Sequence, residues 1–290
     1  MRYAMSRQDS SDYSDTLFSR CIMNKVPAIL FLLLVPILIK AQGKGGDSLI
    51  LRTHSTMLGL GRINQLDSYL SPLEYTGPQV RIVQENTRPT RLLRGRVSMQ
   101  NLIQANFSYT KSPTEDSKYL SGMLDWNLAL HYMWQPAPAL RFLAGPQLGM
   151  HGGGIYNTRN GNNPAQARLA IDLNASGLAI YSFRLFNRSL QARYQLDFLL
   201  AGMAFSPEYG QSYYEIFSLG QEKHNLCFTS PFSAVTVNQL LTLDIPVGAS
   251  QMRIGIEHVM RQTHVNHLKT HDWTWLFLIG YVRHFSLVKP

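Results

Sequence analysis

Cysteine is almost absent from this 290-residue sequence, which contains only Cys21 and Cys227. A disulfide-stabilised scaffold is therefore excluded. Charged residues are also scarce, at 16% of the chain against the roughly 25% usual in soluble domains. In contrast, 13 Phe and 14 Tyr, with many aliphatic residues, supply enough apolar surface to exclude an intrinsically disordered chain.

Long hydrophobic runs are also lacking. The longest, residues 26–39, is shorter than the about 20 residues that a membrane-spanning helix needs, and the mean hydropathy of −0.12 excludes a polytopic helical membrane protein. Lys25 precedes this run, and Lys40, Ala41 and Gly43 follow it, as in a secretory signal peptide. We expect cleavage after Gln42, initiation at Met23, and a mature domain over residues 43–290; an uncleaved signal anchor is the alternative.

The chain has few acidic residues, and its formal net charge is +9. The basic residues are spread singly and form no patch, so we do not predict nucleic-acid binding. No phosphate-binding loop, dinucleotide-binding motif or paired-cysteine motif is present, and no cofactor is expected.

Strict alternation of apolar and polar residues is the dominant pattern of the mature chain, and it is typical of β-strands. In residues 119–134 one face carries the apolar set Leu120, Leu124, Trp126, Leu128, Leu130, Tyr132 and Trp134. The other face carries Ser121, Asp125, Asn127 and His131. A helix would scatter both sets around its axis.

We identify ten such segments, several longer than the five to six residues usual for soluble strands. They begin near Leu49, Gln79, Arg96, Tyr119, Ala139, Ala165, Ser189, Ser233, Gln251 and Asp272. Together they predict an all-β, antiparallel transmembrane β-barrel of about ten strands, within a range of 8–12. The alternative is a secreted β-sandwich or lipocalin-like barrel.

The expected connections alternate in length from the fourth segment onward. Residues 135–137, 186–188 and 248–250 form short links, whereas 154–164, 206–231 and 263–271 form longer ones. Outer-membrane barrels show the same asymmetry, with tight periplasmic turns and long external loops. The pattern therefore predicts that both ends of the barrel chain lie in the periplasm.

If the apolar faces contact lipid, a set of charged residues points into the lumen. It comprises Arg52, Arg81, Glu85, Arg96, Asp125, Arg141, Arg168, Asp172, Arg193, Asp197, Asp244, Arg253 and Glu257. The interior of a narrow barrel is nearly filled by side chains, so we expect these groups to pair across it. They form either a structural polar core or a narrow path for solutes or ions.

The signal peptide, the ten segments and the aromatic-rich final strand together resemble an uncharacterised family of Gram-negative outer-membrane barrels with a domain of unknown function. The resemblance implies an outer-membrane location, contact with the lipid bilayer and no known activity. Gly280, Tyr281 and Phe285 also resemble the signal read by the barrel-assembly machinery. Residues 286–290 extend past the aromatic residue at which such signals usually stop.

Catalysis requires a nucleophile beside a base. His131 and Asp125 share the expected inward face, but no serine with a diagnostic context accompanies them. We assign no catalytic residue, and a lipid-modifying enzyme remains an alternative. His264, His267 and His271 lie near Asp272 in the expected last external loop, where imidazoles can bind zinc or copper or simply be solvated.

The expected loop at residues 206–231 is bordered by aromatic side chains, namely Tyr209, Tyr213, Tyr214, Phe217, Phe228 and Phe232. They can pack as an interfacial girdle or a plug, or form a surface adhesion and binding module. Cys227 in the same loop is expected to be a buried free thiol. The leading functional prediction is a non-enzymatic, porin-like outer-membrane protein with a structural role or narrow passage for small solutes.

Overall fold

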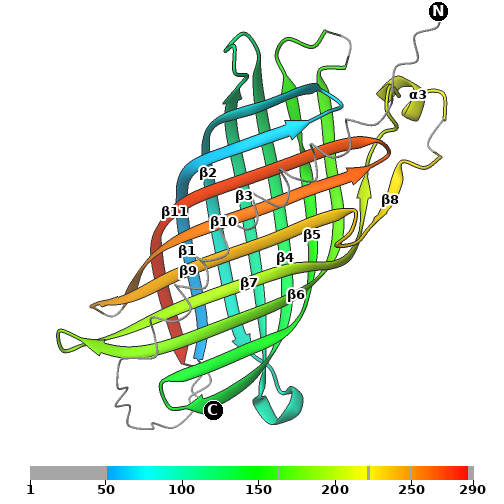
Figure 1. The fold of residues 1–290 in the computed structure, drawn as a ribbon. Coiled ribbons are helices and arrows are strands. Elements are labelled where there is room, and N and C mark those ends of the chain that lie inside the picture. The colour runs from blue at the N-terminus through cyan, green and yellow to red at the C-terminus, as the bar shows by residue number, and fades with distance from the viewer. Residues whose placement is uncertain (1–50, 162, 221–222, 249, 287–290) are drawn as a thin grey trace, which may run out of the picture. The chain divides into compact units, whose positions relative to one another are not determined.

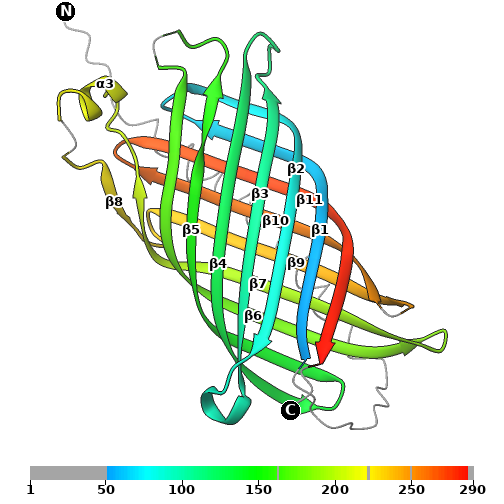
Figure 2. The same cartoon turned by 180° about the vertical axis from the view of Figure 1, so that it is seen from behind.

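The computed structural model describes residues 51–161, 163–220, 223–248 and 250–286. Ten long antiparallel strands form a closed barrel in these residues (Figures 1 and 2). They are β1 (Leu51–Asp67), β2 (Ser71–Pro89), β3 (Val97–Lys111), β4 (Lys118–Ala137), β5 (Leu140–Asn157), β6 (Ala165–Leu185), β7 (Arg188–Phe205), β9 (Ala234–Val247), β10 (Ser250–Val265) and β11 (Leu268–Ser286).

The strands follow one another around the barrel, and the ring closes where β1 pairs with β11, from Leu51↔Ser286 to Asp67↔Thr270. A short strand, β8 (Leu226–Thr229), pairs with the end of β7, and β7 then pairs with β9. Two short helices lie in the described residues, η2 (Leu92–Gly95) and α3 (Tyr213–Phe217). No helix in the described residues is long and apolar enough to cross a membrane.

The side chains alternate as a transmembrane barrel requires, with apolar groups outside and polar groups inside. On β1, the outward side chains of Leu58 and Leu60 are 45% and 57% exposed, whereas the inward side chains of Ser55 and Gln65 are almost fully buried. The prediction of a ten-stranded antiparallel transmembrane barrel is therefore confirmed, and the two-sheet sandwich is excluded.

Some predicted boundaries differ from the structure. The predicted signal peptide and the start near Leu49 lie outside the described residues. The second strand begins at Ser71, ahead of the predicted Gln79. The predicted long loop at residues 263–271 is wrong, because β10 and β11 continue to a two-residue turn at Asn266 and His267. Both turn residues have positive φ angles, 49° and 61°, as a tight hairpin turn requires.

The two ends of the barrel carry different connections. Residues 138–139 and 186–187 and the turn at Gly248 are tight connections at the end where Leu51 and Ser286 pair, and residues 90–96 form a longer link there (Figure 1). We call this the lower end. At the opposite, upper end lie the links 68–70, 112–117, 158–164, 206–233 and 266–267. The alternation in length that was predicted from the fourth segment onward holds except at 266–267.

Candidate functional site

The lower half of the lumen is closed by a buried ionic network centred on Glu85 of β2. Its carboxylate accepts from Arg193 of β7 at 2.7 and 3.1 Å and from Arg253 of β10 at 2.5 Å. Arg253 also donates to both carboxylate oxygens of Asp244 on β9, at 2.6 and 2.7 Å. Gln100 donates a further bond of 2.7 Å to Glu85. No member of this network is more than 10% exposed, so the charges are compensated by one another and not by water.

A second ionic network occupies the middle of the lumen. Arg81 pairs with Glu257 at 2.7 Å. His151 lies between two carboxylates, with Nδ1 2.6 Å from Asp125 and Nε2 3.1 Å from Asp172. Arg261 approaches the same group, 3.5 Å from Asp125 and 3.2 Å from His151 Nδ1. This arrangement places a base between two acids inside the barrel.

A third pair closes the upper lumen, where Arg168 Nη2 lies 3.0 Å from the buried carboxylate of Asp67. Arg168 belongs to β6 and Asp67 to β1, and these two strands lie five strands apart in either direction around the ring. The pairs Glu85–Arg193 and Asp125–Arg261 join β2 with β7 and β4 with β10, which are also five strands apart. Ion pairs thus span the lumen between opposite walls at three levels.

Apolar side chains fill further space inside the barrel. Met57, Val83, Leu102 and Leu278 form a buried cluster, against which Leu240 packs. This layer lies among the ionic networks, because Val83 stands between Arg81 and Glu85 on β2. Side chains therefore pack the lumen at several levels.

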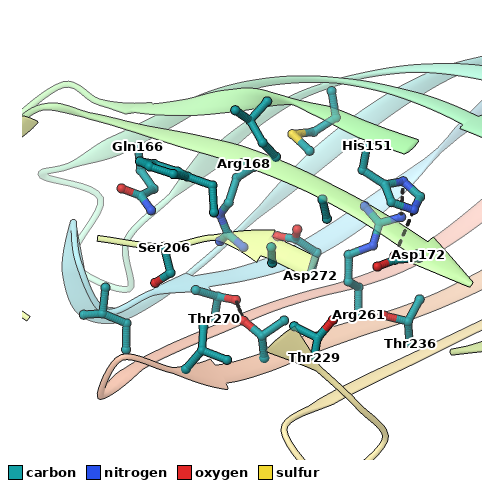
Figure 3. Close-up of a pocket in the computed structure, with 18 residues that line it drawn as sticks. His151, Gln166, Arg168, Asp172, Ser206, Thr229, Thr236, Arg261, Thr270 and Asp272 are labelled. Carbon is teal, nitrogen blue, oxygen red and sulfur yellow. Dashed lines mark hydrogen bonds and ion pairs between the residues drawn. The ribbon is translucent and has the colours of Figure 1, made fainter. Parts of the chain in front are cut away.

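Two small cavities lie among these side chains. The larger, of about 70 Å³, lies in the upper lumen (Figure 3). His151, Asp172 and Arg261 line it together with Arg168 and Asp272. The smaller, of about 30 Å³, lies deeper beside Asp125 and Asp197. His151, Thr236 and Arg261 line both cavities, so the His151 group separates them.

The structure places most of the expected lumen residues inside the barrel. Asp125, Asp172, Arg193, Asp197, Asp244, Arg253 and Glu257 are all less than 9% exposed, and the Arg168 side chain is 15% exposed. Arg141 is half-buried and forms no ion pair within the described residues. Arg96 differs from the expectation: it follows η2, is exposed, and donates to the Tyr132 hydroxyl at 3.3 Å. The chain at Arg96 is still in a turn, with φ −81° and ψ −3°, and is not yet a strand.

Sequence reasoning missed His151, Arg261 and Asp67. Arg261 lies before the predicted loop at 263–271 and continues the inward series of Arg253 and Glu257, so the alternation could have identified it. Asp67 is the last residue of its strand. The glycines at 152–154 conceal the alternation next to His151.

His131 and Asp125 do not meet. His131 is buried, and its Nε2 lies 2.8 Å from the Ser176 hydroxyl, which donates to Asp197 Oδ1 at 2.5 Å. The single hydroxyl proton of Ser176 is directed at a carboxylate, whereas a nucleophilic serine must give its proton to a histidine. The chain His131–Ser176–Asp197 is therefore arranged as a structural contact between strands.

The three candidate metal-binding histidines differ in their exposure and contacts. His264 and His267 are exposed. His271 is buried, bonds Asn64 Oδ1 at 3.0 Å and stacks on Trp273 at 4.2 Å. In the described part of the chain, no three histidine, cysteine or carboxylate side chains are grouped as a metal site.

Segment 206–233 is attached to the upper end of the barrel by hydrogen bonds to β6 and to the turn between β10 and β11. The hydroxyl of Tyr213 donates to Gln166 at 2.9 Å, and Asn266 donates to the carbonyl oxygen of Ser206 at 3.0 Å. A capping box between Ser212 and Glu215 starts α3. Several of its aromatic side chains are exposed, namely Tyr209, Tyr214, Phe217, Phe228 and Phe232. Cys227 is a free, half-buried thiol.

An apolar exterior, a polar interior and alternating strands define a transmembrane β-barrel whose lumen holds paired charged side chains. Residues 28–290 match the family described as "Protein of unknown function (DUF3316)", and the chain belongs to this family. The resemblance to an uncharacterised barrel family is thereby confirmed. No curated protein matches the chain.

Several solved structures are similar to this chain. The outer membrane protease OmpT from Escherichia coli is 8% identical with a TM-score of 0.47, over 84% of this chain and 100% of that one. The translocator domain of the autotransporter NalP from Neisseria meningitidis is 9% identical with a TM-score of 0.38, over 93% and 98%. An outer membrane channel from Pseudomonas putida F1 is 9% identical with a TM-score of 0.37, over 85% and 100%.

Proposed function

We propose that this protein is exported by its N-terminal signal peptide to the outer membrane, where it is a non-enzymatic barrel with a closed lumen. The outward surface supports the location. Tyr132 and Trp134, 42% and 61% exposed, lie toward the lower end of β4, and Tyr109 and Tyr156, 36% and 48% exposed, lie toward the upper ends of β3 and β5. Aromatic girdles of this kind mark the two interfaces of a bilayer.

The ion pairs between opposite walls carry the functional proposal. A conducting pore needs a hydrated path, whereas Glu85 and Arg193 meet across the lower lumen with less than 10% of either residue exposed. The remaining cavities, of about 70 and 30 Å³, correspond to a few water molecules at about 10–15 Å³ each. We infer a structural role in the envelope and no general passage of solutes.

Two measurements test this proposal. Outer-membrane fractions run on gels with and without boiling should show a faster-migrating folded form. The purified protein in planar bilayers should give no discrete conductance steps, whereas regular steps would show an open pore. A soluble periplasmic band without a shift would contradict the membrane location itself.

Surface binding through segment 206–233 is a second candidate. Tyr209, Tyr214 and Phe217 are 75%, 66% and 72% exposed on a segment that the capping box orders, and aromatic side chains are enriched where proteins bind partners. Replacing the three by serine should abolish adhesion of expressing cells, if adhesion is the role, while the gel shift is retained. Unchanged adhesion would exclude this surface.

A further inference from the structure

The barrel wall is interrupted between β7 and β9. β7 pairs with β9 as far as Phe198↔Val237, and it pairs with β8 only from Gly202↔Thr229. Residues 199–201 therefore face residues 230–236 without strand pairing in the described chain. On its other side β7 has a bulge, because Leu173 pairs with Ala201 and Asn174 with Leu199. Both changes occur at the same height of the wall.

Residues on both sides of this interruption line the cavity in the upper lumen. Thr229 and Thr236, which stand at the two ends of residues 230–235, both line the cavity. Ala170 and Ala204 add small side chains to the same wall. The buried hydroxyl of Thr229 has no hydrogen-bond partner among the described residues. A polar group is therefore available at the point where the cavity meets the wall (Figure 3).

The outside of the interruption is apolar. Leu200 and Met203 are 47% and 45% exposed on β7, and Phe228 and Phe232 beyond them are 68% and 101% exposed. In hydrocarbon, every backbone polar group must find a partner within the protein. The unpaired backbone groups at this place therefore need partners, which the hydroxyl groups of a bound amphiphile can supply.

The charges around the cavity select among ligands. Arg168, Arg261 and His151 face the carboxylates of Asp172 and Asp272, and the paired residues Asp67 and Asp125 add two more. Even with His151 protonated, the carboxylates outnumber the cations. These charged side chains therefore do not favour the binding of an anion in the cavity. The unpartnered Arg261 Nε and Thr229 Oγ1 instead suit a group that both donates and accepts hydrogen bonds.

We propose that this cavity binds the headgroup of a single-chain amphiphile whose head is small, uncharged and hydroxyl-bearing, and that the acyl chain leaves through the interruption into the bilayer. A volume of about 70 Å³, which holds roughly five to seven water molecules at about 10–15 Å³ each, has room for a small headgroup but not for a whole lipid. The proposal rests on the membrane location proposed above and adds a ligand site to it.

Photolabelling in phosphatidylcholine nanodiscs tests the site. The probe is a monooleoylglycerol that carries a diazirine on its acyl chain, and the control probe has the same tail with a sulfate headgroup. We expect the monoacylglycerol to label residues 199–204 and 228–236 about fivefold more than the lipid-facing residues of β3, on another part of the wall. The sulfate probe should give about fivefold less label there, equivalent to about 1 kcal/mol.

Two variants test whether the cavity itself is responsible. Ala204→Leu fills the cavity and should reduce labelling of the interruption to the level of β3, whereas Ala105→Leu adds the same side chain to the half-buried outward face of β3 and should not. Thr229→Val keeps the shape of the buried side chain and should weaken labelling without loss of folding. Folding of each variant is checked by the gel shift.

The outcomes separate the two proposals. Absence of the gel shift in the wild-type protein contradicts the membrane location. If the wild-type barrel shows the gel shift but is labelled evenly around its surface, the amphiphile site alone is contradicted. Equal labelling of the wild type and Ala204→Leu contradicts it in the same way. Equal labelling by the sulfate probe contradicts the headgroup assignment.

Discussion

Replacement of Glu85 by glutamine should destabilise the barrel strongly. Glu85 receives hydrogen bonds from Arg193, Arg253, Gln100 and Ser55 and is almost completely buried. The substitution keeps the shape of the side chain and removes its charge. Arg253 retains Asp244 as a partner, whereas Arg193 has no other ion pair in the described residues. A guanidinium is then left without a counter-charge inside the lumen.

The magnitude follows from the burial of the network. Removing one partner of a buried ion pair costs about 3–5 kcal/mol, because the remaining charge stays desolvated. With a urea m-value of about 3 kcal/mol per M, the unfolding midpoint should fall by about 1–1.7 M. Adding Arg193→Met removes the unpaired cation, so the double variant should be less destabilised than the two single variants together. A coupling energy of about 0.5–3 kcal/mol is expected.

Urea titration of the refolded barrel, read by the gel shift and by tryptophan fluorescence, measures these midpoints. The matched control is Glu115→Gln, which removes an exposed carboxylate 2.9 Å from Lys111. Its midpoint should not change, since exposed pairs contribute little. If Glu85→Gln lies within about 0.5 kcal/mol of the wild type, the lumen charges are hydrated and the argument for an occluded barrel fails.

Two further predictions follow from local geometry. Gly202→Ala should destabilise the barrel by about 1–3 kcal/mol, because a Cβ would meet Asp172 and the backbone oxygen of Ile171. Gly122→Ala should not, since its nearest neighbours are 3.8 Å away; equal urea midpoints for the two variants would refute this. Bonds from the Ser212 backbone N–H and hydroxyl lower the pKa of the Glu215 carboxyl, so it stabilises α3 above its ordinary pKa, and this contribution is lost as the pH falls through its lowered value. Proteolysis of segment 206–233 should rise on acidification in the wild type, whereas Glu215→Ala should be cleaved readily at neutral pH and show little pH dependence. Equal cleavage of both at pH 7 would contradict the role of the capping box.

The alternation in the sequence was sufficient to predict the barrel, because each strand has one face toward lipid and one toward the lumen. It also identified the lumen carboxylates, since Asp125 and Asp172 fall on the polar face. It could not identify their partners. Glu85 and Arg193 are 108 positions apart, and their contact depends on the strand number and stagger that bring β2 opposite β7. Turn chemistry was the weaker part: the Asn266–His267 hairpin contains no glycine, which left residues 263–271 looking like a loop.

The pairing of β1 with β11 has a consequence for assembly. Glu85 on β2 and Arg253 on β10 are neighbours only when β1 and β11 lie between them in the finished ring. In an open sheet these charges would remain separated and solvated. The ionic network inside the lumen therefore forms together with the last strand pairing. Its free energy stabilises the closed barrel relative to intermediates in which some strands are not yet paired. We expect the barrel to form in an all-or-none transition, with its charged centre appearing at the final step.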